Sequence, residues 1–562
     1  MNSLPPGFIL ILGAFLIPFL KGRARQALIL ALPCLSLGHL LSLPSDHIVT
    51  AQMFDYQLAP IRVDKLSLVW GYVFHIAAGL TALYSVHEKN SLGHVAGLSY
   101  AGSAIAAAFA ADWITLFVFW ELTAITSVFL IWARRTKRAY TVGLRYLLIQ
   151  VGSGVILLAG VLIHVSQGGS LLIHRMGVDS LGGKLIFLAF GIKCAFPLLH
   201  NWLQDAYPEA TVSGAVFLSA FTTKLAIYAL ARVFPGTEIL IPIGITMTLF
   251  PILFAVIEND LRRVLAYSLN NQLGYMVVGV GIGTELSLNG TAAHAFAHIL
   301  YKGLLFMAMG AVLFRVGTVK ANKLGGLYKS MPWTTVFCII GSLSISGFPL
   351  FSGFVTKSMT LTAVSEAHLA IYAVLLLIAS AGVVDHSGIK IPFFAFFAHD
   401  NGHRVKEAPL NMLLAMGGAA ALCIGLGLYP APLYKILPYP VDYAPYTVSH
   451  VVNSLQLLLF AALAFGILWR TRIYPPEIDA INLDTDWIYR KAAPPVVVAI
   501  GRVCAAIHKA VVGTGAQLGK AVLGGLEKTH APPGVMGEPW GTGATSLWAA
   551  ALLGFCLMIY YL

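Results

Sequence analysis

The segment from Ile192 to Ala210, "IKCAFPLLHNWLQDAYPEA", decides how this sequence is interpreted. It falls in an apolar run long enough to cross a membrane, yet it contains a lysine, two prolines, a histidine, an aspartate and a glutamate. A bilayer penalises ionisable side chains unless they are paired or hydrated, so such residues usually serve a function. The segment therefore predicts a functional, interrupted helix at membrane depth.

The rest of the chain has the composition of an integral membrane protein. Hydrophobic residues make up 58% of the sequence and charged residues only 11%. Apolar runs of about 18 to 25 residues, each long enough to cross the hydrocarbon layer as a helix, recur from residue 8 to residue 470 and again at 545–562. Because only helices and closed barrels satisfy the backbone inside lipid, we predict an all-α polytopic protein with about 14 to 16 transmembrane helices.

Basic residues cluster after the odd-numbered runs, and the loops after even-numbered runs contain few of them. The clusters are Lys21 to Arg25, Arg134 to Arg138, Arg262 and Arg263, Arg315 to Lys329, Lys390 to Lys406, and Arg470 and Arg472. Lysine and arginine concentrate in cytoplasmic loops, so the N-terminus is predicted to lie outside a bacterial inner membrane. The net charge of +12 is then a topology signal and requires no nucleic acid.

The sequence offers no ligand set for a cofactor or metal ion. Its six cysteines occur singly, with no CxxC pair. The glycine-rich stretch "GTGAQLGK" at 513–520 lacks the spacing and the Ser/Thr of a phosphate-binding loop. We expect no cofactor, no metal and no redox centre in this chain.

Seven ionisable residues fall well inside apolar runs, where a charge is costly. They are Glu121, Lys193, Lys224, His294, His298, Lys302 and Lys357. The two histidines and Lys302 are spaced four residues apart and share one helix face. Lys193 precedes Pro197, and Lys357 follows Pro349, so two helices in corresponding parts of the chain are predicted to be broken. Such paired breaks are typical of internal repeats and of ion paths in transporters.

Each residue alone also has a purely structural interpretation. Lys302 could extend to the membrane surface, a single histidine is more often structural than a proton carrier, and Glu121 could join two helices through a lysine. The set as a whole favours a proton relay. His200, Asp205 and Glu209 follow Lys193 and are candidates for a path by which ions reach it, although the two acids could equally be ordinary interfacial residues.

Five stretches resemble the proton-translocating, antiporter-like membrane subunits of respiratory complex I, Mrp-type Na+/H+ antiporters and membrane-bound hydrogenases. They are "FWELTAITSVFLI", "GIKCAFPLLHNWLQDAYPEATVSGAVFLSAFTTKLAIY", "RRVLAYSLNNQLGYM", "HAFAHILYKGLLFMAMGAV" and "SISGFPLFSGFVTKSM". The resemblance covers about residues 65 to 430 and is greatest to the D-type subunits of Mrp antiporters.

The resemblance implies roles for the seven residues. Glu121 matches the family's essential glutamate, Lys193 the lysine of the first broken helix, and Lys224 the bridging lysine. His294, His298 and Lys302 match the central connection, and Lys357 matches the charged residue of the second broken helix, where members carry Lys or Glu. The family's fold further implies two inverted five-helix repeats.

We divide the chain accordingly. The predicted segments are N-terminal helices at 1–91, a first repeat at 92–233, a second repeat at 238–385, C-terminal helices at 386–470, a lateral segment and linker at 471–544, and a terminal anchor at 545–562. The lateral segment is predicted to include an amphipathic helix on the cytoplasmic face that grips a neighbouring subunit; a poorly ordered linker is the alternative.

Three classes of function are compatible with a membrane protein of this kind. An ion-translocating subunit of an Mrp-type complex, with protons and Na+ as its ions and other membrane subunits as partners, accounts for the charged residues. A docking scaffold would not need them, and an enzyme with its own redox chemistry would need cofactor ligands. Very similar subunits also serve redox-driven proton pumps and energy-coupled inorganic-carbon transporters, and the sequence leaves these alternatives open.

Overall fold

A computed structural model describes residues 4–53, 56–480, 482, 484–532 and 534–562. The chain forms two units, Met1–Asp484 and Thr485–Leu562. Within the described residues, 13 helices are long and apolar enough to cross a membrane. The prediction of a polytopic helical membrane protein is therefore confirmed, and the additional elements are shorter helices and one hairpin.

The first third of the chain contains α1 (Phe8–Ala14), η1 (Ile17–Phe19), α2 (Gly22–Ser42), β1 (His47–Met53), β2 (Tyr56–Val63), α3 (Lys65–Ser85), α4 (Ser91–Phe109), α5 (Trp113–Trp132), α6 (Lys137–Ser166), α7 (Leu181–Cys194) and α8 (Asn201–Glu209). The middle contains α9 (Val212–Ala220), α10 (Thr222–Val233), α11 (Leu240–Ile257), α12 (Leu261–Ile282), α13 (Glu285–Val316), η2 (Ala321–Lys323), η3 (Leu327–Lys329), α14 (Pro332–Ser346) and α15 (Ser352–Glu366).

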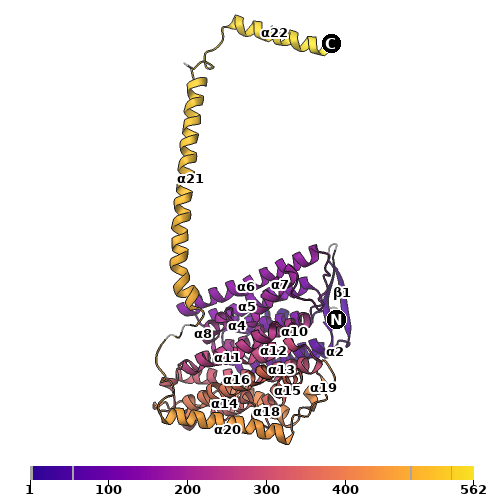
Figure 1. The fold of residues 1–562 in the computed structure, drawn as a ribbon, viewed down its shortest axis with the longest axis vertical. Coiled ribbons are helices and arrows are strands. Elements are labelled where there is room, and N and C mark those ends of the chain that lie inside the picture. Colours follow the sequence, from indigo (N-terminus) through magenta and orange to yellow (C-terminus); the bar gives the residue numbers. More distant parts are fainter. Residues whose placement is uncertain (1–3, 54–55, 481, 483, 533) are drawn as a thin grey trace. The chain divides into compact units, whose positions relative to one another are not determined.

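The remainder of the first unit contains α16 (Ala370–Val383), η4 (Val384–Ile389), α17 (Lys390–Pro392), η5 (Phe393–Phe397), α18 (Leu410–Leu428), α19 (Ala431–Lys435) and α20 (Val448–Arg470). In Figure 1, the purple helices α4 to α7 lie on one side of this unit and the orange helices α14, α18 and α20 on the other, with α12 and α13 between them.

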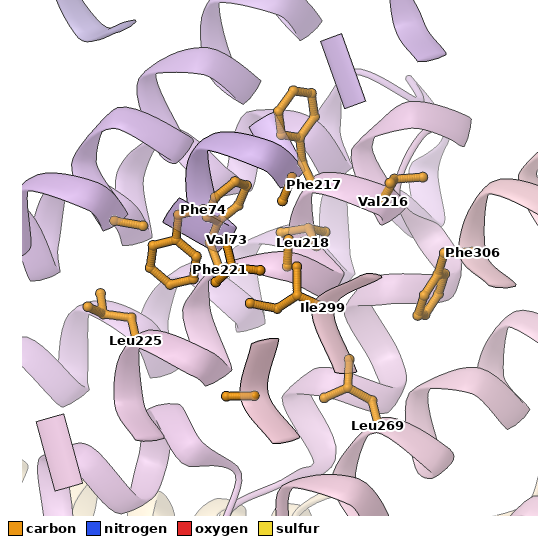
Figure 2. Packing of buried hydrophobic residues seen from close by; sticks show 14 of the residues in the cluster. Val73, Phe74, Val216, Phe217, Leu218, Phe221, Leu225, Leu269, Ile299 and Phe306 are labelled. Atoms are coloured by element: carbon orange, nitrogen blue, oxygen red, sulfur yellow. The ribbon is translucent and has the colours of Figure 1, made fainter. Parts of the chain in front are cut away.

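Helix α13 forms the centre of the first unit. It packs against α3, α9, α12, α14, α15 and α18, and all of its residues from Ser287 to Val312 are buried. Figure 2 shows Ile299 of this helix among apolar side chains of its neighbours, including Phe74, Phe221 and Leu269. The rings of Phe74 and Phe221 meet edge to face at 5.1 Å. Burial of this large apolar area from segments far apart in sequence stabilises the bundle.

Two membrane helices are interrupted where the prolines predicted. Helix α7 ends at Cys194, and Ala195 and Leu198 adopt left-handed backbone angles before α8 begins. Helix α14 ends at Ser346, and Gly347 and Leu350 are left-handed before α15 begins. Interrupted helices leave backbone groups unpaired at membrane depth, where polar side chains or water must satisfy them.

A third interruption was not predicted from the sequence. Phe221 separates α9 from α10 within the run at 211–233, although no proline lies there. Tyr100 of α4 compensates for the break, because its hydroxyl accepts a hydrogen bond from the Thr222 backbone N–H at 2.8 Å. A tertiary contact from a distant helix thus supports the break, and local sequence carries no signal of it.

The structure corrects two other expectations. Residues before α3 form an antiparallel hairpin, β1–β2, which the all-α prediction did not include. Ala59 of this hairpin donates its N–H to Asp112, the N-cap residue of α5, at 2.9 Å. The run predicted to end at residue 385 continues as one span from Ala370 to Phe397. Lys390, predicted to lie in a loop, is therefore inside this span and buried.

The second unit consists of η6 (Ile488–Ala492), α21 (Ala493–His530) and α22 (Thr542–Tyr561). Helix α21 has 38 residues and is continuous through its glycines. Neither α21 nor α22 contains a buried residue. The alternative of a poorly ordered linker is wrong for α21, because this stretch is helical.

Candidate functional site

The first part of the candidate site lies where α5 meets the end of α7. Lys193, in the last turn of α7, is fully buried. Its Nζ donates to the backbone oxygen of Trp120 at 2.5 Å and to Thr123 Oγ1 at 2.8 Å, and it lies 4.3 Å from the centre of the Trp120 ring. The ammonium thus has a carbonyl, a hydroxyl and an aromatic face as partners.

Glu121 follows Trp120 on the same helix and interacts electrostatically with Lys193. Its Oε1 atom is buried without a hydrogen-bond partner, and no ion pair joins the two side chains in the described part of the chain. A carboxylate that is not hydrogen-bonded to a nearby lysine can move away from that lysine at little cost in free energy. A pair that switches between a short and a long separation requires this freedom.

Lys224 is positioned by the interruption between α9 and α10. The break frees the backbone oxygen of Ser219, which accepts a hydrogen bond from Lys224 Nζ at 2.6 Å. The Lys224 backbone oxygen in turn accepts a bond from the indole N–H of Trp70 at 2.9 Å. Both ends of this residue are therefore anchored, and its side chain is fully buried.

The three residues at four-residue spacing on α13 do face the same region. The ring centres of His294 and His298 are 6.2 Å apart, and Lys302 Nζ donates to Ser268 Oγ of α12 at 2.7 Å. His298 interacts electrostatically with both Lys224 and Lys302. All three are fully buried, so Lys302 does not extend to the membrane surface.

Lys357 closes the row on α15. Its Nζ donates to Ser380 Oγ at 2.7 Å and lies 4.6 Å from the centre of the Tyr275 ring. It lines a cavity of about 740 Å³ together with Glu366, His450 and other residues of α15, α16 and α20. This volume is large enough for many water molecules. Along this row of seven residues, electrostatic interactions link Glu121 with Lys193, Lys224 with His298 and Lys302, and His294 with Lys357, which lines the cavity. Glu121 is half-buried, and the other six residues are buried.

The other three predicted residues lie where α8 meets its neighbours. Asp205 pairs with Arg145 and Arg263 at 3.2 Å each, and Glu209 pairs with Arg138 at 2.8 Å. Glu209 also contacts Arg134. Arginines from other helices thus pair with both acids that the sequence had offered as part of a path for ions.

His200 has a partner that the sequence did not indicate. Its Nε2 lies 3.2 Å from Asp484, whose carboxylate also accepts hydrogen bonds from Tyr267 (2.8 Å) and from the amide of Asn201. Asp484 and His200 side chains are each only 1% exposed. The feature of the sequence that could have suggested such a partner is the acidic stretch at 477–486, which follows the last basic cluster of the first unit.

Sequence reasoning also missed a polar group on η4 and α17. His386, Ser387 and Lys390 are buried inside the span Ala370–Phe397. The sequence does contain one indication that the span includes these residues. The apolar stretch "IPFFAFF" at 391–397 continues the apolar run beyond them.

Comparison with known proteins places this arrangement in a family. Residues 110–382 match the family described as "NADH:quinone oxidoreductase/Mrp antiporter, TM". Over 348 residues the chain is 32% identical to the D-type component of the Na(+)/H(+) antiporter of Alkalihalophilus pseudofirmus, covering 58% of this chain and 70% of that protein. Over 434 residues it is 28% identical to hydrogenase-4 component B of Escherichia coli, covering 67% of this chain and 63% of that protein.

The fold extends the similarity to the whole chain. A subunit of the membrane-bound sulfane sulfur reductase, an archaeal respiratory membrane complex, superposes with a TM-score of 0.69 at 20% identity, covering 99% of this chain and all of that one. The chain spans less than two thirds of the hydrogenase component's length. These matches confirm the resemblance drawn from the five sequence stretches: the chain belongs to the NADH:quinone oxidoreductase/Mrp antiporter transmembrane family.

Proposed function

We propose that the chain is the proton-translocating subunit of an Mrp-type cation/proton antiporter and that it moves protons in exchange for Na+. One observation carries the proposal. Four lysines and two histidines from two parts of the chain lie buried in one row, with Glu121 as the carboxylate at one end. Ionisable residues buried at membrane depth are expensive, and a row of them is typical of a proton path.

The partners of the lysines favour transfer of charge over permanent pairing. In a medium of low dielectric constant, a charge affects its neighbours strongly. Protonation of Lys193 therefore opposes protonation of Lys224, and the effect continues through His298 to Lys302. In this mechanism, Glu121 separates from Lys193 to release a proton toward Lys224, and Lys357 exchanges protons with the aqueous phase through the 740 Å³ cavity.

The loops and the second unit support an orientation and an assembly. Basic loops support a cytoplasmic position for the ends of α5 and α11 and an N-terminus outside a bacterial inner membrane. We assign residues 92–233 and 238–385 to two inverted repeats. Helix α21 has apolar and basic residues and no buried surface of its own, which supports a lateral contact with other membrane subunits of the complex.

A second candidate is a proton channel in a redox-driven complex. The similarity to a hydrogenase component supports it. The energy source would then be supplied by partner subunits, and Na+ would have no effect on proton movement.

The test is Lys193→Ala in everted vesicles that contain the whole complex. Respiration acidifies the vesicle lumen, and a fluorescent dye reports how quickly added Na+ dissipates the pH gradient. We expect a loss of roughly a hundredfold or more in the initial rate, the scale of a missing proton-transfer group. Lys184→Ala is the matched control, because Lys184 lies on the same helix but is exposed.

Equal rates for the wild type and Lys193→Ala would refute proton transfer along this row. Unchanged proton movement in the absence and presence of Na+ would favour the redox-driven candidate. Mass spectrometry of the subunits that co-purify in mild detergent then separates the two assemblies, since only the second contains iron–sulfur or flavin proteins.

A further inference from the structure

The polar group on η4 and α17 has no role in the row described above, yet it is buried in the bundle. Residues Val384–Ile389 form a π-helix within the span Ala370–Phe397. His386 and Ser387 are fully buried, and Lys390 is 1% exposed. π-Helical turns inside α-helices are rare and occur frequently at functional sites, because the extra residue redirects side chains.

Hydrogen bonds join this group to Lys302. Lys302 Nζ donates to Ser268 Oγ at 2.7 Å. Ser387 Oγ donates to the same Ser268 oxygen at 2.6 Å, and His386 Nδ1 lies 2.8 Å from Ser387 Oγ. The two hydroxyls thus form a continuous connection between the amine of Lys302 and the imidazole of His386. Hydroxyl groups both donate and accept, so such a chain can pass a proton.

His386 also interacts electrostatically with Lys390, which belongs to a second polar cluster. Lys390, four residues further along, donates to the backbone oxygens of Ala255, Val256 and Glu258 at the end of α11, at 2.6 to 3.1 Å. It also interacts electrostatically with Asp385 and Glu477. Glu477 and Tyr474 belong to the segment that follows α20. The cluster therefore lies between the interior and the face where α11 ends and α12 begins.

Several buried polar atoms of this cluster have no partner among the described residues. They are His386 Nε2, Asp385 Oδ1, Tyr474 OH and Glu477 Oε1. Buried polar atoms are nearly always hydrogen-bonded, so groups without a protein partner are expected to bind water. The cluster is thus suited to hold water between His386 and the half-buried Glu477.

We propose that Ser268, Ser387 and His386 form a proton-uptake branch that loads Lys302 from the face of the membrane where Glu477 lies. The branch rests on the proposed function of the chain. It gives the second repeat its own supply of protons, separate from the region around His200 and Asp484.

The transfer conserves atoms and charge. A proton from water binds His386 Nε2 and forms an imidazolium. The Nδ1 proton then moves to Ser387 Oγ, the Ser387 proton moves to Ser268 Oγ, and the Ser268 proton moves to the neutral amine of Lys302. The products are a neutral His386 and a Lys302 ammonium. The ring now carries its proton on Nε2, so a flip of the imidazole together with rotation of the two hydroxyls restores the starting arrangement, and no further reactant is needed.

The experiment uses the vesicle assay with Ser387→Ala, Ser268→Ala and Ser387→Thr. We expect the two alanine variants to lower the initial rate of proton movement by roughly tenfold, and the threonine variant, which keeps the hydroxyl, to retain most of it. Ser103→Ala is the matched control: Ser103 is also fully buried, but among the described residues its hydroxyl bonds only the Ser99 backbone oxygen of its own helix. Rates are divided by the amount of assembled complex on native gels.

Wild-type rates in both alanine variants, together with a loss of transport in Lys193→Ala, would overturn the branch and leave the proposed function in place. Wild-type rates in both alanine variants and also in Lys193→Ala would overturn the branch and the proposed function together. A threonine variant as slow as the alanine variant would also contradict the branch, because the hydroxyl would then not be the group that matters.

Discussion

At the scale of single residues, the buried lysines are held by weak partners. Lys193 and Lys224 bond backbone oxygens, whereas Lys302 and Lys357 bond serine hydroxyls. A carboxylate partner would fix the charge on each lysine, because separating a buried ion pair is costly. Neutral dipoles stabilise an ammonium less strongly, so each lysine can exchange its proton. Within the described residues, Lys193 alone among these four has a carboxylate, Glu121, as an electrostatic partner.

The position of Glu121 depends on a glycine in the next helix. Gly154 of α6 lies directly against the carboxylate, and a Cβ atom at this position would overlap Glu121 Oε1. Gly152, one half-turn away on the same helix, has nothing within 4 Å of such an atom. Of these two glycines, Gly154 is therefore the one whose missing side chain leaves space for Glu121.

We predict that Gly154→Ala slows transport and that Gly152→Ala does not. Alanine favours a helix over glycine by up to about 1 kcal/mol, so neither change should weaken α6 itself. At position 154, however, the methyl group must displace the carboxylate from Lys193, and we expect a rate at least about tenfold lower. The vesicle assay measures the rate, and thermal unfolding measures stability. Equal rates in the two variants would show that the position of Glu121 is not critical.

At the scale of elements, charged contacts fix the helix ends that surround the row. Asp64 is the N-cap of α3 and accepts from the Ser67 N–H at 2.9 Å. Its carboxylate also receives two hydrogen bonds from Arg232 in the last turn of α10, at 2.6 and 2.7 Å. Burial alone would raise the pKa of Asp64, but the hydrogen bonds from Arg232 hold the pKa of this carboxyl below its usual value.

This pair predicts a pH-dependent stability. A carboxyl with a lowered pKa stabilises the folded state above its unfolded pKa of about 3.9, and this contribution is lost as the pH falls through the folded value. Asp64→Asn should therefore lower the unfolding free energy by about 2–4 kcal/mol at pH 7, and the difference from the wild type should shrink below roughly pH 4. Thermal unfolding of the purified protein in detergent measures both.

Asp442→Asn is the control for this change, because Asp442 is exposed. It should unfold like the wild type at both pH values. A difference between Asp64→Asn and the wild type that persists unchanged at pH 3 would contradict a charge-based role for Asp64 and indicate a packing effect.

At the scale of the whole molecule, the sequence allowed prediction of the buried lysines and histidines and of the two proline-linked breaks, because a charge inside an apolar run is costly and therefore noticeable. It did not allow prediction of features that depend on tertiary partners. Lys390 was assigned to a loop, because no nearby residue in the sequence indicates how its charge could be buried. Its three carbonyl partners lie at the end of α11, more than 130 residues earlier in the chain. The break at Phe221 and the role of Asp484 were missed for the same reason.

The division into two units leads to a prediction about the C-terminal part of the chain. Near the end of the first unit, Asp479 pairs with Lys320 at 2.8 Å, and Asp484 contacts His200. In contrast, α21 and α22 have no buried residues. The first unit should therefore need the segment up to Asp484 but not the second unit for its own stability.

We predict that a chain ending at Asp484 unfolds at nearly the wild-type temperature but no longer retains its partner subunits. A chain ending at Arg472 loses the contacts of Asp479 and Asp484, and its Tm should fall by roughly 2–4 °C relative to the longer truncation. Fluorescence-monitored unfolding in detergent gives the Tm, and mild-detergent purification gives the subunits retained. If the chain ending at Asp484 still holds every partner, then the exposed apolar surface of α21 and α22 is not where the subunits meet, and the lateral contact proposed for α21 is wrong.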